Sequence, residues 1–151
     1  MFDTNVFNSI LDEKLKIIKH TDQEYFITNL QRAEINRTKN KERRENLVSM
    51  FLVVTSSTHT TQVNQLSTPW GSPWSSPWSN SGQYYKSILN ALESRKPKDR
   101  GNSYDAVMIE TCKYKEISFV SNDSAVLGVS KEFGVKCISF SDFSRECLGS
   151  A

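Results

Sequence analysis

The sequence predicts an α/β domain with three layers, α/β/α, built around a mostly parallel central sheet. Short runs of β-branched and aromatic residues alternate with longer segments in which apolar residues recur at helical spacing. Chains that alternate strands and helices in this way usually form a mostly parallel sheet covered by helices. The length of 151 residues suits one domain with its own core, so we expect a single domain over residues 1–151.

The N-terminal part of the chain is expected to alternate two strands with two helices. In order, the elements are strand 1–2, helix 6–18, strand 25–28 and helix 30–47. Asp3 closes the first strand, and Asp3 or Asn5 can cap the first helix. Residues 50–54 fit either a helix or a buried strand. The Ser- and Thr-rich residues 55–61 favour an extended or irregular segment.

Residues 66–82 interrupt this alternation with three Pro-Trp pairs, which place Trp70, Trp74 and Trp78 at intervals of four. Prolines at this density exclude a helix, so we expect a long ordered loop or a mobile flap. Three interpretations of the tryptophans stay open. Their rings can stack on bases of single-stranded RNA, anchor a protein partner, or fold back onto the domain.

The C-terminal half resumes the alternation and is expected to end in a short tail. In order, the elements are helix 84–93, basic linker 95–101, helix 102–114, strand 117–120, helix 124–133 and strand 135–140. Gly134 follows the last of these helices and can adopt the left-handed backbone conformation that closes helices.

Charge and cysteine content restrict the class of protein. The net charge of +2 is too small to identify a nucleic-acid partner by itself. Cys112, Cys137 and Cys147 form no CxxC pair, which argues for a reducing compartment and against a structural zinc site. The sequence has no apolar run long enough to span a membrane, and we expect no signal peptide, because Asp3 and Asp12 interrupt the N-terminal segment. We therefore expect a cytoplasmic protein with no membrane partner.

Acidic side chains at strand ends give the first indication of function. Asp3 and Asp123 each follow a predicted strand, and Asp105 starts an apolar helical pattern. Because the carboxyl ends of parallel strands converge on one edge of a sheet, these acids can gather in one pocket. Clustered carboxylates repel one another unless cations fill the pocket, and oxygen-only ligands suit Mg²⁺ or Mn²⁺.

These acids also have ordinary structural interpretations. Asp3 and Asp123 are natural helix N-caps, and Asp105 can stabilise a helix start through the macrodipole. Glu34 can pair with Arg37 or Thr38 on a solvated helix face. Taken singly, the two N-caps and Glu34 favour these structural interpretations, whereas the acids taken together favour a metal site.

In order and spacing, these motifs resemble the PIN-domain nucleases. The residues that carry the resemblance are Asp3-Thr4-Asn5, Glu34, Asp105-Ala106 and Ser121-Asn122-Asp123. The resemblance extends over nearly the whole chain, and its first and last motifs are the most specific. The very short first strand and the Pro-Trp segment depart from the family pattern.

The resemblance implies a metal-dependent endoribonuclease, similar to the small stand-alone toxins of toxin–antitoxin pairs. The implied metal ligands and catalytic residues are Asp3, Glu34, Asp105 and Asp123, with one or two Mg²⁺ or Mn²⁺ ions. Asn5 and Asn122 would aim the carboxylates, and Ser121 would contact substrate or metal-bound water. RNA is then the expected substrate and a small antitoxin protein the expected partner. Because small members of the family often look dimeric, the resemblance also implies a homodimer.

Basic residues close to these acids have two interpretations. The basic run at residues 37–44 is interleaved with glutamates, so it fits a solvated helix face as well as a surface that contacts RNA phosphates. The candidate RNA contacts are Arg37, Arg43, Arg44, Lys98, Arg100, Trp70, Trp74 and Trp78.

Two other functions are alternatives. A haloacid-dehalogenase-like phosphatase also begins with a strand-end aspartate, and Asn122-Asp123 is similar to a later motif of that family. However, Asn5 stands where that family needs a second aspartate. The other alternative is a catalytically silent PIN-like domain that binds RNA or protein.

Overall fold

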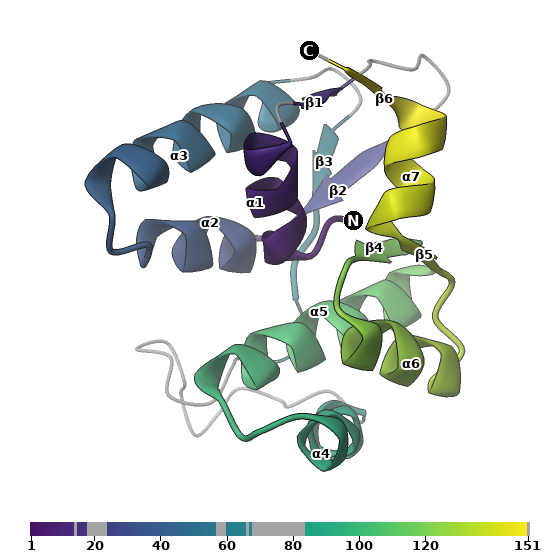
Figure 1. Cartoon of the computed structure of the whole chain (residues 1–151). Helices are drawn as coiled ribbons and strands as arrows, with labels where there is room; N and C mark the ends of the chain where they lie inside the picture. Colours follow the sequence, from purple (N-terminus) through teal and green to yellow (C-terminus); the bar gives the residue numbers. More distant parts are fainter. Residues whose placement is uncertain (14, 18–23, 57–59, 66, 68–83, 151) are drawn as a thin grey trace. The chain divides into compact units, whose positions relative to one another are not determined.

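Figure 1 shows the computed structural model, which divides into two compact units. The structure describes every residue except 14, 18–23, 57–59, 66, 68–83 and 151. The first unit consists of Met1–Val63, Val120–Asn122 and Ile138–Ala151, and the second of Asn64–Phe119 and Asp123–Cys137. The described residues form a mixed α/β structure with seven helices, which confirms the α/β class. None of these helices is long and apolar enough to cross a membrane.

Four of the described helices belong to the first unit. They are α1 (Thr4–Asp12), α2 (Asn29–Asn36), α3 (Lys41–Thr55) and α7 (Phe140–Cys147). The helices α1, α2 and α3 pack against one another, as Figure 1 shows. Val6, Phe7 and Ile10 form the buried face of α1 at helical spacing, as the sequence predicts.

The core of the first unit is built around Phe2. The ring of Phe2 contacts the rings of Phe7, Tyr25 and Phe143, with centroid distances of 5.7, 5.6 and 5.1 Å. Phe2 also forms an isolated parallel bridge with Val120. Aromatic contacts of this kind contribute beyond the area that they bury. They fix the backbone directly before Asp3, which is where the candidate site begins.

The described strands form three two-stranded sheets. In the first unit, β1 (Leu15–Ile17) is antiparallel to β6 (Leu148–Ser150), and β2 (Tyr25–Ile27) is parallel to β3 (Thr60–Gln62). The third pair is β4 (Phe119–Ser121) with β5 (Cys137–Ser139). Two of the three pairs are parallel. A single central sheet with helices on both faces stays a prediction.

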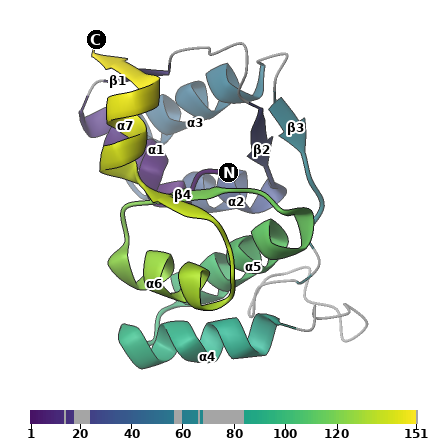
Figure 2. The same cartoon turned by 90° about the vertical axis from the view of Figure 1, so that its right-hand side faces the viewer.

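The second unit contains α4 (Tyr85–Arg95), α5 (Arg100–Lys115) and α6 (Ser124–Glu132). Figure 2 shows α4 beside α5, and α4 also packs against α6. Every residue of α5 from Asn102 to Cys112 is buried, which is typical of a helix with protein on all sides. Asp105 and Glu110 are the two acids of this helix that are buried, and a buried acid needs a partner.

The structure corrects both helices predicted for the N-terminal part. The helix predicted over 6–18 ends at Asp12, and residues 15–17 form a strand because they pair with the distant residues 148–150. The helix predicted over 30–47 is interrupted between Asn36 and Lys41. There the side chain of Asn40 accepts a hydrogen bond of 2.8 Å from the N–H of Arg43 and so caps the start of a new helix. Residues 50–54 continue α3 as a helix.

The end of the chain is also different from the prediction of a short tail. Helix α7 begins at Phe140, where the sequence predicts the end of a strand. The hydroxyl of Ser139 accepts the N–H of Asp142 at 3.2 Å, and Phe140 and Phe143 are buried at helical spacing. A serine followed by this apolar spacing was the signal that could have predicted the helix.

Candidate functional site

Asp3 is buried at the start of α1 in the first unit. Its backbone N–H donates to the carbonyl of Val120 at 2.9 Å, and its carboxylate Oδ2 accepts the hydroxyl of Ser121 at 2.8 Å. The other oxygen, Oδ1, accepts a longer bond of 3.4 Å from the N–H of Asn5, so Asp3 also caps α1. A buried carboxylate needs such donors, because burial disfavours its charged form. The cap and an oriented carboxylate are therefore combined in one residue.

A buried glutamine holds the backbone that carries Asp3. The Nε2 of Gln31 donates to the carbonyl of Phe2 at 2.6 Å, and its Oε1 accepts the N–H of Thr28 at 2.6 Å. Thr28 and Gln31 form the capping box that begins α2. The same amide thus starts a helix and fixes the residue before Asp3. Sequence reasoning missed Gln31, although the Thr-x-x-Gln spacing was a visible signal.

Glu34 is tied to the N-terminal motif through Thr4. The hydroxyl of Thr4 donates to Oε2 of Glu34, which lies on α2 and is partly buried. Thr4 directly follows Asp3, so the structure places Glu34 against the residue next to the first candidate acid. The pairing of Glu34 with Arg37 stays a prediction.

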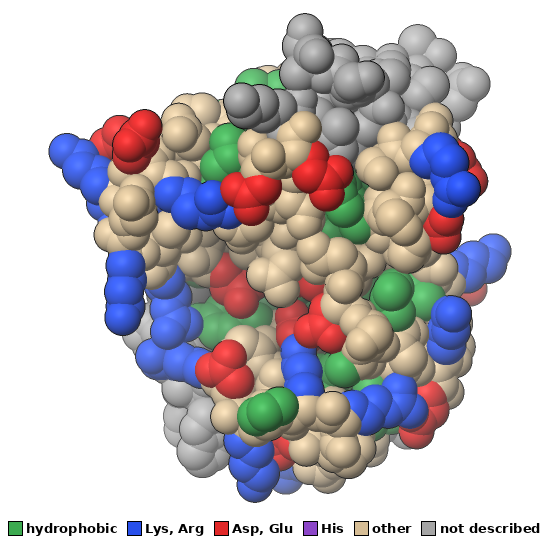
Figure 3. All heavy atoms as spheres, in the orientation of Figure 1, with side chains coloured by type: hydrophobic (Ala, Val, Ile, Leu, Met, Phe, Trp, Pro, Cys, Tyr) green, Lys and Arg blue, Asp and Glu red, His purple; other side chains and the backbone are tan. Residues whose placement is uncertain are grey.

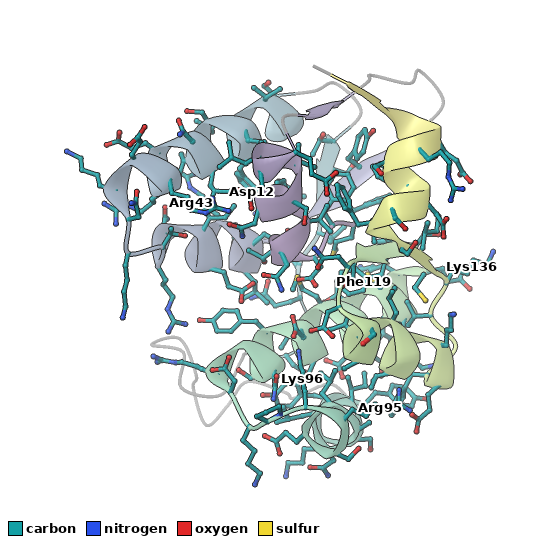
Figure 4. The ribbon with its side chains drawn as sticks, viewed as in Figure 1. Asp12, Arg43, Arg95, Lys96, Phe119 and Lys136 are labelled. Carbon is teal, nitrogen blue, oxygen red and sulfur yellow. The ribbon has the colours of Figure 1, made fainter. Side chains whose placement is uncertain are left out.

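In the second unit, Asp105 and Asp123 converge on a single ammonium group. The Nζ of Lys96 lies 2.8 Å from Oδ2 of Asp105 and 3.0 Å from Oδ2 of Asp123. These three side chains are only 20%, 11% and 26% exposed. Figure 4 labels Lys96 at the end of α4, with its side chain directed toward α5 and α6. The structure therefore brings two of the predicted acids together around one positive charge.

The local sequence explains why Lys96 points this way. Lys96 is the C-cap of α4, and its backbone is extended, with φ −146° and ψ 159°. Proline disfavours the helical conformation in the residue before it, so Pro97 ends α4 at this point. The Nδ2 of Asn102 donates to the carbonyl of Pro97 at 3.0 Å and fixes the linker to α5.

The two carboxylate oxygens of Asp123 have different roles. Its Oδ1 accepts the N–H of Ala125 at 2.9 Å and that of Val126 at 3.3 Å, so it caps α6. Its Oδ2 contacts Lys96. The N-cap interpretation of Asp123 is thus confirmed, and it leaves one oxygen for a cation. By contrast, Asp105 lies in the second turn of α5, because Asp99 caps that helix.

The ion pairs shift the pKa values of Lys96 and Asp123. Burial acts to lower the pKa of Lys96, but the charges and hydrogen bonds of Asp105 and Asp123 outweigh it and raise that pKa. Burial acts to raise the pKa of Asp123, but its hydrogen bond to Lys96 and the Lys96 charge, together with the N–H groups that it caps, lower it. Both groups are therefore charged over a wide range of pH around neutrality.

The predicted supporting residues lie as follows. Ser121 is fully buried and donates to Asp3, so its hydroxyl orients a carboxylate. Asn122 is exposed and donates from Nδ2 to the hydroxyl of Ser9 at 2.6 Å. Asn5 is exposed and contacts Asp3 through its backbone N–H. Thr4 and Ser121 donate to the carboxylates of Glu34 and Asp3, and the orienting role of Asn5 and Asn122 stays a prediction.

Of the candidate RNA contacts, Arg43 has a structural role. Its guanidinium binds both carboxylate oxygens of Asp12 at 2.7 and 3.0 Å and also donates to Oδ1 of Asn8. Figure 4 shows Arg43 and Asp12 directed toward each other between α3 and α1. Arg44 donates to the carbonyl of Thr38 at 3.0 Å. These bonds fix α3 to the rest of the first unit.

Other basic candidates are exposed. Arg37, Lys98 and Arg100 lie at the surface, and Lys98 is 4.0 Å from Glu93 in a weak pair. Figure 3 shows Lys and Arg side chains over the ends of α2 and α3. Trp70, Trp74 and Trp78 lie outside the described residues, as does most of the predicted loop at 66–82.

The donor chemistry of the second unit fits a hard cation. Asp105 and Asp123 offer carboxylate oxygens to one position, and Mg²⁺ and Mn²⁺ prefer such ligands. Within the described ranges, no group of three or more His, Cys, Asp or Glu side chains that could hold a metal ion is found. The fit therefore rests on the carboxylate pair and on the cation that it already binds.

Comparisons with known proteins identified no relative of this chain. A scan of protein-family models found no match, and searches of curated proteins and of solved structures found no significant match.

Proposed function

We propose that this protein is a Mg²⁺- or Mn²⁺-dependent endoribonuclease with a three-layer, PIN-like fold. The observation that carries the proposal is the convergence of Asp105 and Asp123 on one cationic nitrogen, at 2.8 and 3.0 Å. Two carboxylates that offer oxygens to one cation provide the hard anionic ligands that a divalent ion prefers. The buried carboxylate of Asp3, held by Ser121, supports the same conclusion.

The proposal gives each acid a role. Asp3, Asp105 and Asp123 are metal ligands, and Glu34, held by Thr4, orients the attacking water or completes the ligand set. A bound divalent ion supplies positive charge that offsets the charge of the phosphodiester and favours deprotonation of water. The hydrogen bonds to Asp3 and Glu34 reduce the reorganisation that these carboxylates need before reaction.

The exposed basic residues complete the proposal for substrate binding. Arg37, Lys98 and Arg100 are assigned to phosphate contacts, because these basic residues lie exposed at the surface. Arg43 is assigned to the fold, because Asp12 and Asn8 already bind its guanidinium. Loss of one phosphate contact should reduce the salt dependence of RNA binding without changing sequence preference.

The test is cleavage of four substrates: total tRNA, single-stranded RNA, single-stranded DNA and a phosphate-monoester dye. Each is incubated with Mg²⁺, Mn²⁺ or EDTA. We expect RNA cleavage that requires metal and is abolished in Asp3→Asn and in Asp123→Asn. Asp142→Asn on α7 is the control, because no step of the proposal uses that acid. Full RNA cleavage in both site variants would refute the assignment, and release of the dye alone would favour a phosphatase.

A second candidate is a PIN-like domain that binds RNA or protein without cleavage. It is favoured by the ion pairs of Lys96, because an internal cation already neutralises two of the acids. In that case the protein would bind RNA equally well in EDTA and in Mg²⁺ and would cleave none of the four substrates. Metal-dependent cleavage would exclude it.

The proposal extends to a toxin with a small antitoxin partner in the cytoplasm. If that extension is correct, induced expression in bacteria should arrest growth, and Asp3→Asn should relieve the arrest. A small protein encoded next to this chain should then suppress the arrest and co-purify with it. Normal growth during expression of soluble, RNA-cleaving protein would remove the toxin role and leave the nuclease proposal unchanged.

A further inference from the structure

We infer that Lys96 is a resident counter-ion at the metal position. Its ammonium holds Asp105 and Asp123 together in the metal-free protein, and a divalent cation binds these acids by displacing it. The inference rests on the proposed function, because it takes Asp105 and Asp123 as metal ligands. It gives Lys96 a role that no motif of the sequence indicated.

The geometry is that of a shared cation. A single nitrogen, Lys96 Nζ, makes hydrogen bonds to one oxygen from each acid, at 2.8 Å to Asp105 and 3.0 Å to Asp123. A divalent ion bound by these two acids would compete with this nitrogen for the same two oxygens. Because two cations repel each other strongly at such a distance, the ammonium and the metal exclude each other.

The neighbouring basic residues show that this contact is specific to Lys96. Arg95 pairs with Glu132 at 2.6 Å, and Lys98 lies 4.0 Å from Glu93. Of these three basic residues on either side of Pro97, Lys96 is the one that contacts both candidate ligands. The conformation imposed by Pro97 therefore determines which positive charge enters the acidic position.

Lys96 can also leave without disturbing the fold around it. Its backbone is held at the end of α4, where its N–H donates to the carbonyl of Leu92 at 3.0 Å. The lysine side chain has a flexible four-carbon stem, and it is 20% exposed here, so the ammonium has a path to water. Displacement thus requires rotation of a side chain and no movement of a helix.

Lys96 and a divalent cation therefore compete for the carboxylates of Asp105 and Asp123. Two carboxylates at one position repel each other when no cation is present, so Lys96 stabilises the metal-free protein. The same ion pairs must be broken before a metal binds, which weakens the apparent metal affinity. Removal of the charge at Lys96 should therefore tighten metal binding, although most changes near a metal site weaken it.

The decisive measurement is the Mn²⁺ affinity of the full chain, followed by electron paramagnetic resonance of free Mn²⁺ at constant ionic strength. Lys96→Met removes the charge and keeps the length of the side chain. We expect Lys96→Met to bind Mn²⁺ about tenfold more tightly or better. Lys96→Arg, which keeps the charge, should stay within about twofold of wild type. Lys131→Met, an exposed lysine of α6, is the matched control and should not change the affinity.

The outcomes separate this inference from the proposed function. Wild-type binding that Asp123→Asn abolishes, with no gain in folded Lys96→Met, would overturn the role of Lys96 alone. An equal gain in Lys96→Arg would also overturn it, because the charge would then not be the cause. Absence of Mn²⁺ binding in wild type at millimolar concentration, or binding that Asp123→Asn leaves intact, would overturn the metal site itself.

A measurement on wild-type protein covers the case in which Lys96→Met does not fold. The ammonium ¹H–¹⁵N resonance of Lys96, assigned by its loss in Lys96→Arg, should show slow hydrogen exchange in EDTA. Saturating Mg²⁺ should move it to the position of an exposed lysine. A resonance that keeps its position and its slow exchange at saturating Mg²⁺ would show that the metal does not displace Lys96.

Discussion

Glu110 and Ser67 are joined by a buried hydrogen bond of 2.5 Å, in which the serine hydroxyl donates to the carboxylate of Glu110. The other oxygen of Glu110 accepts the backbone N–H of Tyr84 at 3.1 Å. Ser67 and Tyr84 lie on either side of residues 68–83. One buried side chain of α5 therefore holds both ends of the segment that contains the three tryptophans.

Replacing Glu110 should destabilise the protein more than replacing a surface acid. Glu110→Ala removes buried packing and leaves the donors of Ser67 and Tyr84 without this acceptor, so we expect a loss of about 2–4 kcal/mol in the free energy of unfolding. Urea titration measures it. Glu132→Ala is the control, because its exposed pair with Arg95 should contribute less than about 1 kcal/mol. Equal losses in the two variants would show that Glu110 does not hold this segment.

Because of Lys96, we expect Asp105→Asn to change the stability of the protein in the direction opposite to the one that repulsion among the acids predicts. Repulsion among clustered acids predicts that Asp105→Asn stabilises the metal-free protein. Because Lys96 already neutralises this charge, we expect Asp105→Asn and Lys96→Met each to lower stability in EDTA by about 1–3 kcal/mol. Thermal unfolding in EDTA checks this, with Lys131→Met as the unchanged control. Higher melting temperatures in Asp105→Asn would show that repulsion dominates.

The stability difference between wild type and Lys96→Met in EDTA should depend on pH in a defined way. The folded pKa of Asp123 is lowered, so its contribution is present above the usual value of about 3.9 and is lost as the pH falls through the folded pKa. The folded pKa of Lys96 is raised, so its contribution is complete below the usual value of about 10.4 and is lost above the folded pKa. The difference should therefore be largest between about pH 5 and pH 10. A difference that does not decrease in strong acid would contradict the role of Asp123.

Ser121 should matter more than its neighbour Asn122. Ser121→Ala removes a donor from the buried carboxylate of Asp3, which should lower the free energy of unfolding by about 1–3 kcal/mol. Asn122→Ala removes an exposed hydrogen bond to Ser9 and should change it by less than about 1 kcal/mol. The two variants are compared by urea unfolding. A smaller loss in Ser121→Ala than in Asn122→Ala would contradict the orienting role of Ser121.

Replacing Glu116 by glycine should stabilise the protein. It ends α5 in the left-handed conformation, with φ 54°, and the N–H of Ile117 bonds back to the carbonyl of Cys112 at 2.9 Å. Glycine adopts this conformation without a Cβ clash, so Glu116→Gly should raise stability by about 1 kcal/mol. Lys115→Gly, one residue earlier in the helix, should lower it by a similar amount. A melting temperature that falls in both variants would contradict this prediction.

Much of the local structure could be predicted because its causes are local. The helices α4, α5 and α6 follow from apolar spacing, and Gly134, with φ 75°, closes the last of them as predicted. Asp123 was identified as a cap from its position after a strand. The interruption between Asn36 and Lys41 was missed, because a charged helical pattern outweighed the capping side chain of Asn40.

The sequence by itself determined the α/β class, most helix positions and the candidate acids, since periodicity and capping depend on residues a few positions apart. Only the tertiary structure decided the strand at Leu15–Ile17, whose partner lies at the other end of the chain. It also decided that Lys96 lies between Asp105 and Asp123, and that Ser121 orients Asp3. These contacts depend on how distant segments pack, and a side chain buried by packing must find its partner among the groups that packing brings to it.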